Sequence, residues 1–398
     1  MHKVILAYSG GLDTSCCVAW LREQGLDVIT YTADLGQGIN FAQLRKKARD
    51  CGVSKVYIQD LRSKFLNNFV FPALQAGAIY EAKYPLATAL GRPLIAEGLV
   101  EIAHKEKAEY IAHGCTGKGN DQVRIEVSVA SLDKGLKAIA PLREWDLETR
   151  EQEISYAQKH KIKVEATKKS PYSYDVNLWG RSIESGVLED PAQEPPKEIY
   201  QLTKDPLQCA NRVIYLTIGF TKGIPTTLNG KKLNGLSLVA KLNKLAGNSG
   251  VGRIDLVENR LVGIKSREIY EAPAATVLHL AHQELESLVL DKQTAQFKAI
   301  VAQRYAQLVY NGLWHSPLKQ ALDKFVAKTQ SKVSGTIRLK LYKGSCVCVG
   351  RKSAHSLYKK ELATYQKGDQ FDQSAAEGFI KIWGLPYNSG QKRGVEDA

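Results

Sequence analysis

The chain has 398 residues, 44% of them hydrophobic and 24% charged, an ordinary composition for a globular protein of two or three domains. No run of eighteen apolar residues occurs, and the first apolar run is too short for a signal-peptide core, so we expect neither a membrane-spanning helix nor secretion. The net charge of +14 falls mostly in the second half, above all in residues 319–360, where we expect a solvated basic face rather than a nucleic-acid site.

The seven cysteines form an odd set without a CxxC pair. They indicate neither a disulfide framework nor a common zinc site, and they favour a reducing compartment, the cytoplasm. Cys346 and Cys348 alternate as residues on one face of a strand do, and we expect them to be structural.

The first 165 residues alternate short apolar runs with helical patterns. We predict strands at residues 4–7, 28–33, 56–59 and 110–113, and helices between them, including 41–51 and one that starts near Asp121. This alternation predicts a parallel sheet covered by helices, an α/β fold. Ligands of such sheets lie beyond the carboxyl ends of the strands, so the residues after Ala7, Ala33 and His113 are the first candidates for a site.

The alternation ends near residue 166. Shorter strand-like runs follow at residues 213–220, 252–264 and 336–349, with a long helical pattern over residues 274–311, and together they predict a second, α+β domain. Residues 189–197 contain three prolines and are expected to form a surface connection. A tail from about residue 362 mixes apolar and polar residues and is expected to pack on another subunit. We therefore predict domains at 1–166 and 167–361 and a tail at 362–398.

A glycine-rich run follows the first predicted strand directly and opens a helix. Gly10 and Gly11 allow backbone conformations closed to other residues, and the helix N-terminus offers unpaired N–H groups with a partial positive charge. Ser9, Thr14 and Ser15 add hydroxyls. The run therefore predicts a phosphate-binding loop, although neither the P-loop pattern nor the dinucleotide pattern GxGxxG after a strand is present.

A second glycine-rich loop, residues 113–119, follows the predicted strand at 110–113. Asn120 suits a helix N-cap, which would place Asp121 in the first turn and Arg124 beside it. A paired carboxylate and guanidinium match the ammonium and carboxylate of a free amino acid. A surface ion pair is the alternative that the residues leave open.

The run Ser9–Ser15 resembles the pyrophosphate-binding loop of the N-type ATP pyrophosphatases, which cleave ATP between the α- and β-phosphates. The chain as a whole resembles the argininosuccinate synthase family, in residues 7–15, 84–95, 113–126, 170–191 and 252–273. This resemblance implies an adenine nucleotide alpha hydrolase-like ATP domain and a synthetase domain. It also implies ligation of citrulline and aspartate through a citrullyl-adenylate, releasing AMP and pyrophosphate in arginine biosynthesis. A cytoplasmic homotetramer with Mg²⁺ on the ATP phosphates is expected, without a membrane or nucleic-acid partner.

The resemblance also implies which residues bind each substrate. For ATP they are Ala7, Tyr8, Ser9, Gly10, Gly11, Leu12, Asp13, Thr14, Ser15, Ala33 and Gly114. For aspartate they are Thr116, Asn120 and Asp121. For citrulline they are Tyr84, Asn120, Arg124, Ser173, Ser182, Glu258 and Tyr270. No residue is assigned as the general base for the aspartate amine or as a metal ligand.

Several positions weaken or qualify this assignment. Ser173 and Ser182 are expected in a loop, where serine is common. Ala89 stands where many members of the family carry a serine, and Glu268 and residues 272–275 depart from the commonest sequence around Tyr270.

Two other functions remain open at this stage. A tRNA-modifying relative that adenylates a base and delivers sulfur would use the basic second half and Cys115, although such chemistry generally needs paired cysteines. A non-enzymatic anion-binding module would bind nucleotide without turnover. His279 and His282 have the spacing of metal ligands on a helix, but no third ligand accompanies them in the sequence, so core or surface positions are favoured.

Overall fold

The computed structural model describes residues 1–147, 149–163 and 171–388. Residues 1–355 form one compact unit and residues 356–398 another. The predicted boundary at 166/167 lies outside the described residues. Among the helices described, none is long and apolar enough to cross a membrane.

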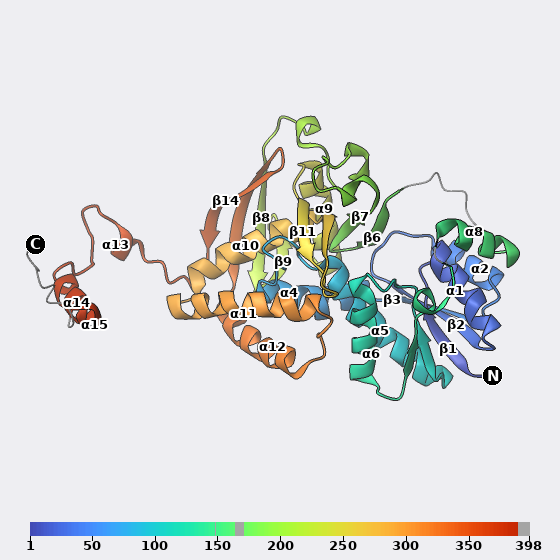
Figure 1. Ribbon diagram of the computed structural model, residues 1–398. Coiled ribbons are helices and arrows are strands. Elements are labelled where there is room, and N and C mark those ends of the chain that lie inside the picture. The colour runs from blue at the N-terminus through green and yellow to red at the C-terminus, as the bar shows by residue number, and fades with distance from the viewer. Residues whose placement is uncertain (148, 164–170, 389–398) are drawn as a thin grey trace, which may run out of the picture. The chain divides into compact units, whose positions relative to one another are not determined.

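A parallel five-stranded sheet forms the start of the chain, as the sequence predicted (Figure 1). Its strands lie in the order β3-β2-β1-β4-β5, and their bounds are β1 Lys3–Ala7, β2 Asp27–Asp34, β3 Lys55–Asp60, β4 Tyr110–Ala112 and β5 Lys137–Ile139. Successive residues of a strand point to opposite faces. In β1, Val4 and Leu6 belong to one buried cluster and Ile5 to another, so both faces of the sheet are covered.

Helices cover the two faces of this sheet (Figure 1). The cluster around Val4 and Leu6 takes in residues of α1 Leu12–Glu23, α2 Phe41–Asp50 and α8 Arg150–Lys159. The cluster around Ile5 takes in α5 Ala87–Glu106 and α6 Asn120–Leu132. The short elements of this part are α3 Arg62–Phe65, the π-helix η1 Leu66–Val70, α4 Phe71–Ala76 and α7 Pro141–Glu144.

Two antiparallel sheets follow. One has the order β10-β9-β8-β13-β14, with β8 Ile214–Thr221, β9 Ile224–Leu228, β10 Lys231–Lys232, β13 Gly335–Tyr342 and β14 Ser345–Lys352. The other has the order β11-β12-β7-β6, with β6 Ser173–Asn177, β7 Gly180–Glu184, β11 Arg253–Asn259 and β12 Lys265–Glu271. The α+β character predicted for the second half is confirmed.

The helices of the second half are α9 Gly235–Asn248, α10 Pro273–Val289, α11 Lys292–Tyr310 and α12 Pro317–Thr329, with 3₁₀ turns η2 Gly186–Glu189, η3 Lys197–Ile199, η4 Pro206–Gln208 and η5 Gln330–Lys332. The long helical pattern predicted over residues 274–311 forms two helices, α10 and α11. Leu290 leaves the helical conformation, and Asp291 caps a second helix by accepting a hydrogen bond from the Thr294 N–H. The strand-like run at 252–264 likewise ends at Asn259, where a turn leads into β12.

The unit of residues 356–398 contains α13 Lys360–Ala363, α14 Ala375–Trp383 and α15 Leu385–Asn388. In α14, Phe379, Ile382 and Trp383 are each more than half exposed. The predicted boundary at 361/362 and the role of the tail stay predictions.

Candidate active site

The phosphate loop lies where β1 ends and α1 begins. Gly10 has a φ of +80°, a conformation that favours glycine, and a Cβ there would have to displace the end of the Leu44 side chain, whose Cδ1 would lie 2.4 Å away. Gly11 is the N-cap of α1, and no side chain in the described part of the chain caps this helix. Its first-turn N–H groups therefore face the end of the sheet with the positive end of the helix dipole, as an anion site needs.

Hydroxyl groups hold this loop in shape. Ser9 Oγ lies 3.1 Å from Thr14 Oγ1 and accepts from the Gly11 N–H at 3.3 Å. Ser15 Oγ donates to the Gly11 carbonyl oxygen at 2.7 Å. The sequence did not single out Lys47 of α2, whose Nζ donates to the Gly10 carbonyl oxygen at 2.6 Å and brings a cation to the loop.

Gly114 and Ala33 lie beside the loop at the ends of neighbouring strands. A Cβ at Gly114 would come within 2.9 Å of Thr14 Cγ2, so glycine lets the loop after β4 approach α1 closely. Ala33 lies one residue before the end of β2 and is buried. Gly114 is six residues before Asn120, and a chain of that length spans at most roughly 20 Å. The loop after β4 therefore connects the phosphate loop directly with the start of α6.

A pocket lies between α5, the start of α6 and the sheet of β6, β7, β11 and β12. All seven residues predicted for citrulline line it, and Asp121 of the aspartate set lines it as well. The pocket lining does not include Thr116. The other lining residues are Thr88, Gly119, Tyr174, Asp175, Glu184, Arg260 and Glu268.

Asn120 is the first residue of α6 rather than its N-cap, which is Gly119, so the predicted capping role is wrong. Its side chain instead joins two distant segments. Nδ2 donates to the Tyr310 hydroxyl at 2.8 Å, and Oδ1 accepts from the Leu261 N–H at 2.8 Å. Asn120 therefore anchors both the end of α11 and the turn between β11 and β12 to the start of α6.

Asp121 and Arg124 form the contact that the sequence predicted, and the pair is not a surface ion pair. Arg124 is 4% exposed, its Nη1 donates to Asp121 Oδ1 at 2.8 Å, and its Nε donates to the Tyr310 carbonyl oxygen at 2.8 Å. Its Nη2 is buried and has no hydrogen-bond partner among the described residues. A buried cationic donor left unpaired is costly, so this atom is suited to an anionic ligand.

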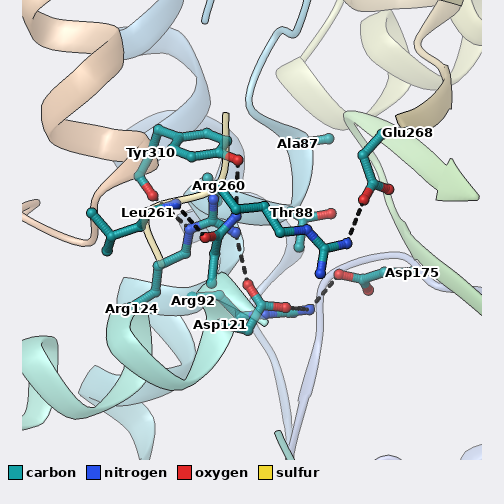
Figure 2. Close-up of polar contacts among 12 residues, drawn as sticks. Ala87, Thr88, Arg92, Asp121, Arg124, Asp175, Arg260, Leu261, Glu268 and Tyr310 are labelled. Carbon is teal, nitrogen blue, oxygen red and sulfur yellow. Dashed lines mark hydrogen bonds and ion pairs between the residues drawn. The ribbon is translucent and has the colours of Figure 1, made fainter. Parts of the chain in front are cut away.

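Arg92 is a second guanidinium in the site that sequence reasoning missed (Figure 2). Its Nη2 donates to Asp121 Oδ2 at 2.8 Å and to Asp175. Burial by itself would raise the pKa of Asp121, but Arg92 and Arg124 outweigh it and hold that pKa well below its usual range. The signal for Arg92 was an arginine between the apolar residues Leu90 and Leu94 of α5, a place where a buried charge needs charged partners.

Glu258 provides a buried carboxylate at the same pocket. It is 3% exposed and accepts hydrogen bonds from the Tyr270 hydroxyl at 2.6 Å and from the Tyr310 hydroxyl. Burial raises the pKa of Glu258, while the two tyrosines and the Arg124 charge oppose that shift. Tyr84 stacks on Tyr270 with ring centroids 4.1 Å apart.

Ser173 and Ser182 lie on β6 and β7, so the predicted loop is wrong, although both serines do line the pocket. Residues 173–184 are a short antiparallel pair. Ala89 is fully buried and adds no hydroxyl to the pocket, whereas Thr88, one residue earlier, lines it.

Glu268 has a defined place, although it departs from the commonest family sequence. Its Oε1 accepts from Arg260 Nη2 at 2.7 Å (Figure 2). The same nitrogen contacts Glu184. Burial and the neighbouring Glu184 charge raise the pKa of Glu268. Arg260 Nη1 also donates to the Lys118 carbonyl oxygen at 3.3 Å, so this arginine holds the loop before α6.

The histidines and three of the cysteines considered in the sequence analysis do not form a metal or nucleophile site in the described residues. His279 and His282 are buried in α10, where burial lowers the pKa of His279 to about 3, and no group of three metal-ligating side chains occurs in the described ranges. Cys346 and Cys348 both pack against the core from one face of β14. Burial raises the pKa of the Cys115 thiol to about 12, which disfavours a thiolate nucleophile there.

Known proteins are similar to this chain over nearly its whole length. The model of the arginosuccinate synthase N-terminal HUP domain matches residues 3–163, and that of the arginosuccinate synthase C-terminal domain matches residues 172–389. Argininosuccinate synthases from Chlorobium phaeobacteroides and Aquifex aeolicus are each 55% identical to the chain, over 385 and 386 residues, and that from Nostoc punctiforme is 56% identical over 386. Each alignment covers 96% of both sequences. The resemblance seen in the sequence is confirmed, and the chain belongs to the argininosuccinate synthase family.

Proposed function

We propose that the pocket binds citrulline beside the phosphate loop and that the protein ligates citrulline to aspartate with cleavage of ATP to AMP and pyrophosphate. One observation carries this proposal. Arg124, whose buried Nη2 has no partner among the described residues, and the buried carboxylate of Glu258 both line the pocket, and these two charges suit the α-carboxylate and α-ammonium of one amino acid. Ser173 and Ser182 offer hydroxyls to the remaining polar atoms of such a ligand.

The reaction follows from the weakness of a ureido carbon as an electrophile. The citrulline ureido oxygen attacks the α-phosphorus of ATP and the bond to the β-phosphate oxygen breaks, releasing pyrophosphate. Backbone N–H groups at the start of α1 hold that pyrophosphate, apart from those of Gly11 and Ser15, which donate to Ser9 Oγ and to the Gly11 carbonyl oxygen. The aspartate amine then attacks the ureido carbon, the carbon–oxygen bond breaks and AMP leaves. Positioning and charge neutralisation account for most catalysis of such transfers.

Thr116, Asn120 and Asp121 are proposed to bind aspartate. Asp121 is poorly suited to take the proton of the aspartate amine, because two guanidinium groups hold its pKa low. We therefore assign Asp121 to binding and leave the general base unassigned.

We also propose that Mg²⁺ accompanies the phosphates of ATP. The loop carries hydroxyls and the carboxylate of Asp13, hard oxygen ligands that suit Mg²⁺, in the first turn of α1. The ion supplies charge neutralisation on the phosphates. Lys47 adds a protein cation next to Gly10.

The deciding experiment is product analysis with ATP labelled in the α- and γ-phosphates. The label should appear in AMP and pyrophosphate, and release of AMP should require both citrulline and aspartate. ADP formation, or nucleotide binding without turnover, would refute the proposal. Turnover that depends on tRNA in place of citrulline would support the tRNA-modifying alternative instead.

A cytoplasmic homotetramer is the proposed working form. The apolar side chains that α14 exposes, Phe379, Ile380, Ile382 and Trp383, support burial of this helix by another subunit. The seven free thiols support a reducing compartment. Light scattering should give four times the chain mass at micromolar concentration, and a monomer would contradict the proposal.

A further inference from the structure

Tyr310, the last residue of α11, contacts three residues of the proposed substrate site, although it does not line the pocket. Its hydroxyl donates to Glu258 and accepts from Asn120 Nδ2 at 2.8 Å. Its carbonyl oxygen accepts from Arg124 Nε at 2.8 Å. The three residues lie 52, 190 and 186 positions away in the sequence.

The hydroxyl of Tyr310 fixes the direction of both hydrogen bonds. A carboxylate only accepts, so the phenolic proton is committed to Glu258 Oε1. The remaining lone pairs can then only accept, so the amide of Asn120 must turn its Nδ2 toward Tyr310. This leaves Oδ1 for the Leu261 N–H, as observed. One O–H group therefore sets the orientation of two residues proposed to bind substrate.

Packing holds the Tyr310 ring in place. The ring is fully buried and stacks on Tyr80 with centroids 3.7 Å apart, and Tyr84 meets it edge-on at 6.4 Å. The Arg124 guanidinium carbon lies 4.7 Å from the ring centroid. Beyond the helix end, Gly312 has a φ of +74°, and a Cβ there would lie 2.8 Å from Arg124 Cα, so glycine lets this turn sit directly on α6.

Glu258 consequently has one tyrosine donor on each oxygen. Tyr270 donates to Oε2 at 2.6 Å from a neighbouring strand of the same sheet, and Tyr310 donates to Oε1 from a separate helix. The other charged or titratable groups that face Glu258 are Tyr80, Tyr84, Arg124, Arg260 and Glu268. Both donors stabilise the ionised carboxylate, which is the form that pairs with an ammonium.

We propose that Tyr310 is a positioning residue for citrulline binding. Its hydroxyl orients Glu258 toward the citrulline ammonium and Asn120 toward both substrates, and its carbonyl oxygen holds Arg124. This inference rests on the proposed function. It assigns to α11, a helix outside the pocket lining, control over citrulline affinity.

The test is Tyr310→Phe with Tyr305→Phe as the matched control. Both substitutions remove one hydroxyl from a buried tyrosine of α11, but the Tyr305 hydroxyl donates to Asp323 at 2.9 Å, away from the pocket. In Tyr310→Phe the Michaelis constant for citrulline should rise about tenfold, because a hydrogen bond to a charged group is lost. The kcat and the Michaelis constant for aspartate should change less, because Leu261 still holds Asn120 Oδ1.

The pH profile separates positioning from a general structural defect. Citrulline binding needs ionised Glu258, so kcat/KM for citrulline should fall on the acid side as this group protonates. Removal of one donor makes ionisation harder, so in Tyr310→Phe the acid limb should move to higher pH by about one unit. In Tyr305→Phe it should not move.

Incorporation of 3-fluorotyrosine at position 310 gives an independent result that does not depend on folding of the Phe variant. The more acidic phenol is a stronger donor, so the acid limb should move to lower pH, whereas fluorotyrosine at position 305 should leave it in place. Equal behaviour of the two positions in both experiments would overturn the inference. Absence of citrulline turnover in the unmodified protein would instead overturn the proposed function.

Discussion

The assignment of Arg124 to the citrulline carboxylate can be tested by Arg124→Gln. The substitution removes the charge and the unpaired Nη2 together with the donors to Asp121 and the Tyr310 carbonyl oxygen. Hydrogen bonds from a guanidinium to a carboxylate contribute about 2–3 kcal/mol. That corresponds to a rise of about 30- to 150-fold in the Michaelis constant for citrulline, because each 1.4 kcal/mol is about tenfold.

The same substitution should also lower stability. Removal of one partner of a buried ion pair costs about 3–5 kcal/mol, and we expect the lower end here because Asp121 keeps its contact with Arg92. Steady-state release of pyrophosphate, with ATP and aspartate saturating, measures the kinetic effect. Thermal unfolding measures the stability effect. Arg143→Gln is the control, since Arg143 contacts Gln122 and Glu126 of the same helix outside the pocket lining.

An analogue separates loss of contact from loss of structure. Citrulline α-amide lacks the negative charge, so the unmodified protein should bind it far more weakly than citrulline. If Arg124 binds the citrulline carboxylate, the affinities of Arg124→Gln for the two compounds should differ by less than about threefold. An undiminished preference for citrulline in the variant would refute the assignment, whatever the change in stability.

Three further outcomes are expected. Gly10→Ala should abolish ATP–pyrophosphate exchange and lower the free energy of unfolding by about 1–3 kcal/mol, because the φ of +80° and the contact with Leu44 both disfavour a side chain. Unchanged exchange in this variant would show that the loop does not take part in the reaction. Glu106→Gln should lower the melting temperature at pH 7, with the difference shrinking as the pH falls from 5 toward 2. Hydrogen bonds from Lys55 and its neighbours lower the pKa of Glu106 to about 2. The ionised Glu106 side chain therefore stabilises the protein at pH values above the pKa of the unfolded state, and this stabilisation is lost as acid protonates the native state. A difference in melting temperature that stays constant with pH would contradict this. Cys115→Ala should retain kcat within about threefold, because a thiol whose pKa is raised to about 12 by burial is not a nucleophile at neutral pH. Loss of turnover would instead favour the tRNA-modifying alternative, in which Cys115 reacts.

The parts of the fold predicted best from sequence were those fixed by local signals. The phosphate loop combines a buried strand, two glycines and a helix start within a few residues, and the pairing of Asp121 with Arg124 follows from helical spacing. Local signals also existed for two features that the predictions missed. Asp291 followed by Thr294 is a cap that divides the predicted long helix, and the alternation around Ser173 and Ser182 is that of two short strands.

Contacts between distant segments were not accessible in that way. Tyr310 ends an ordinary amphipathic helix, and nothing in its neighbourhood in the sequence connects it with Asn120 or Glu258. Arg260 lies in a turn, where an arginine is unremarkable without knowledge that Glu268 and the loop before α6 face it. The residues proposed to bind substrate followed from family resemblance, whereas the groups proposed to orient them could be found only in the tertiary structure.

The two charges proposed to recognise citrulline come from different parts of the fold. Arg124 belongs to a helix of the parallel-sheet domain, and Glu258 belongs to an antiparallel strand formed more than a hundred residues later. Neither part alone presents both charges. The contacts of Asn120 with Leu261, and of Arg124 and Glu258 with Tyr310, therefore do more than stabilise the fold. They set the separation between a cation and an anion, and we expect this separation to select an amino acid over other small anions.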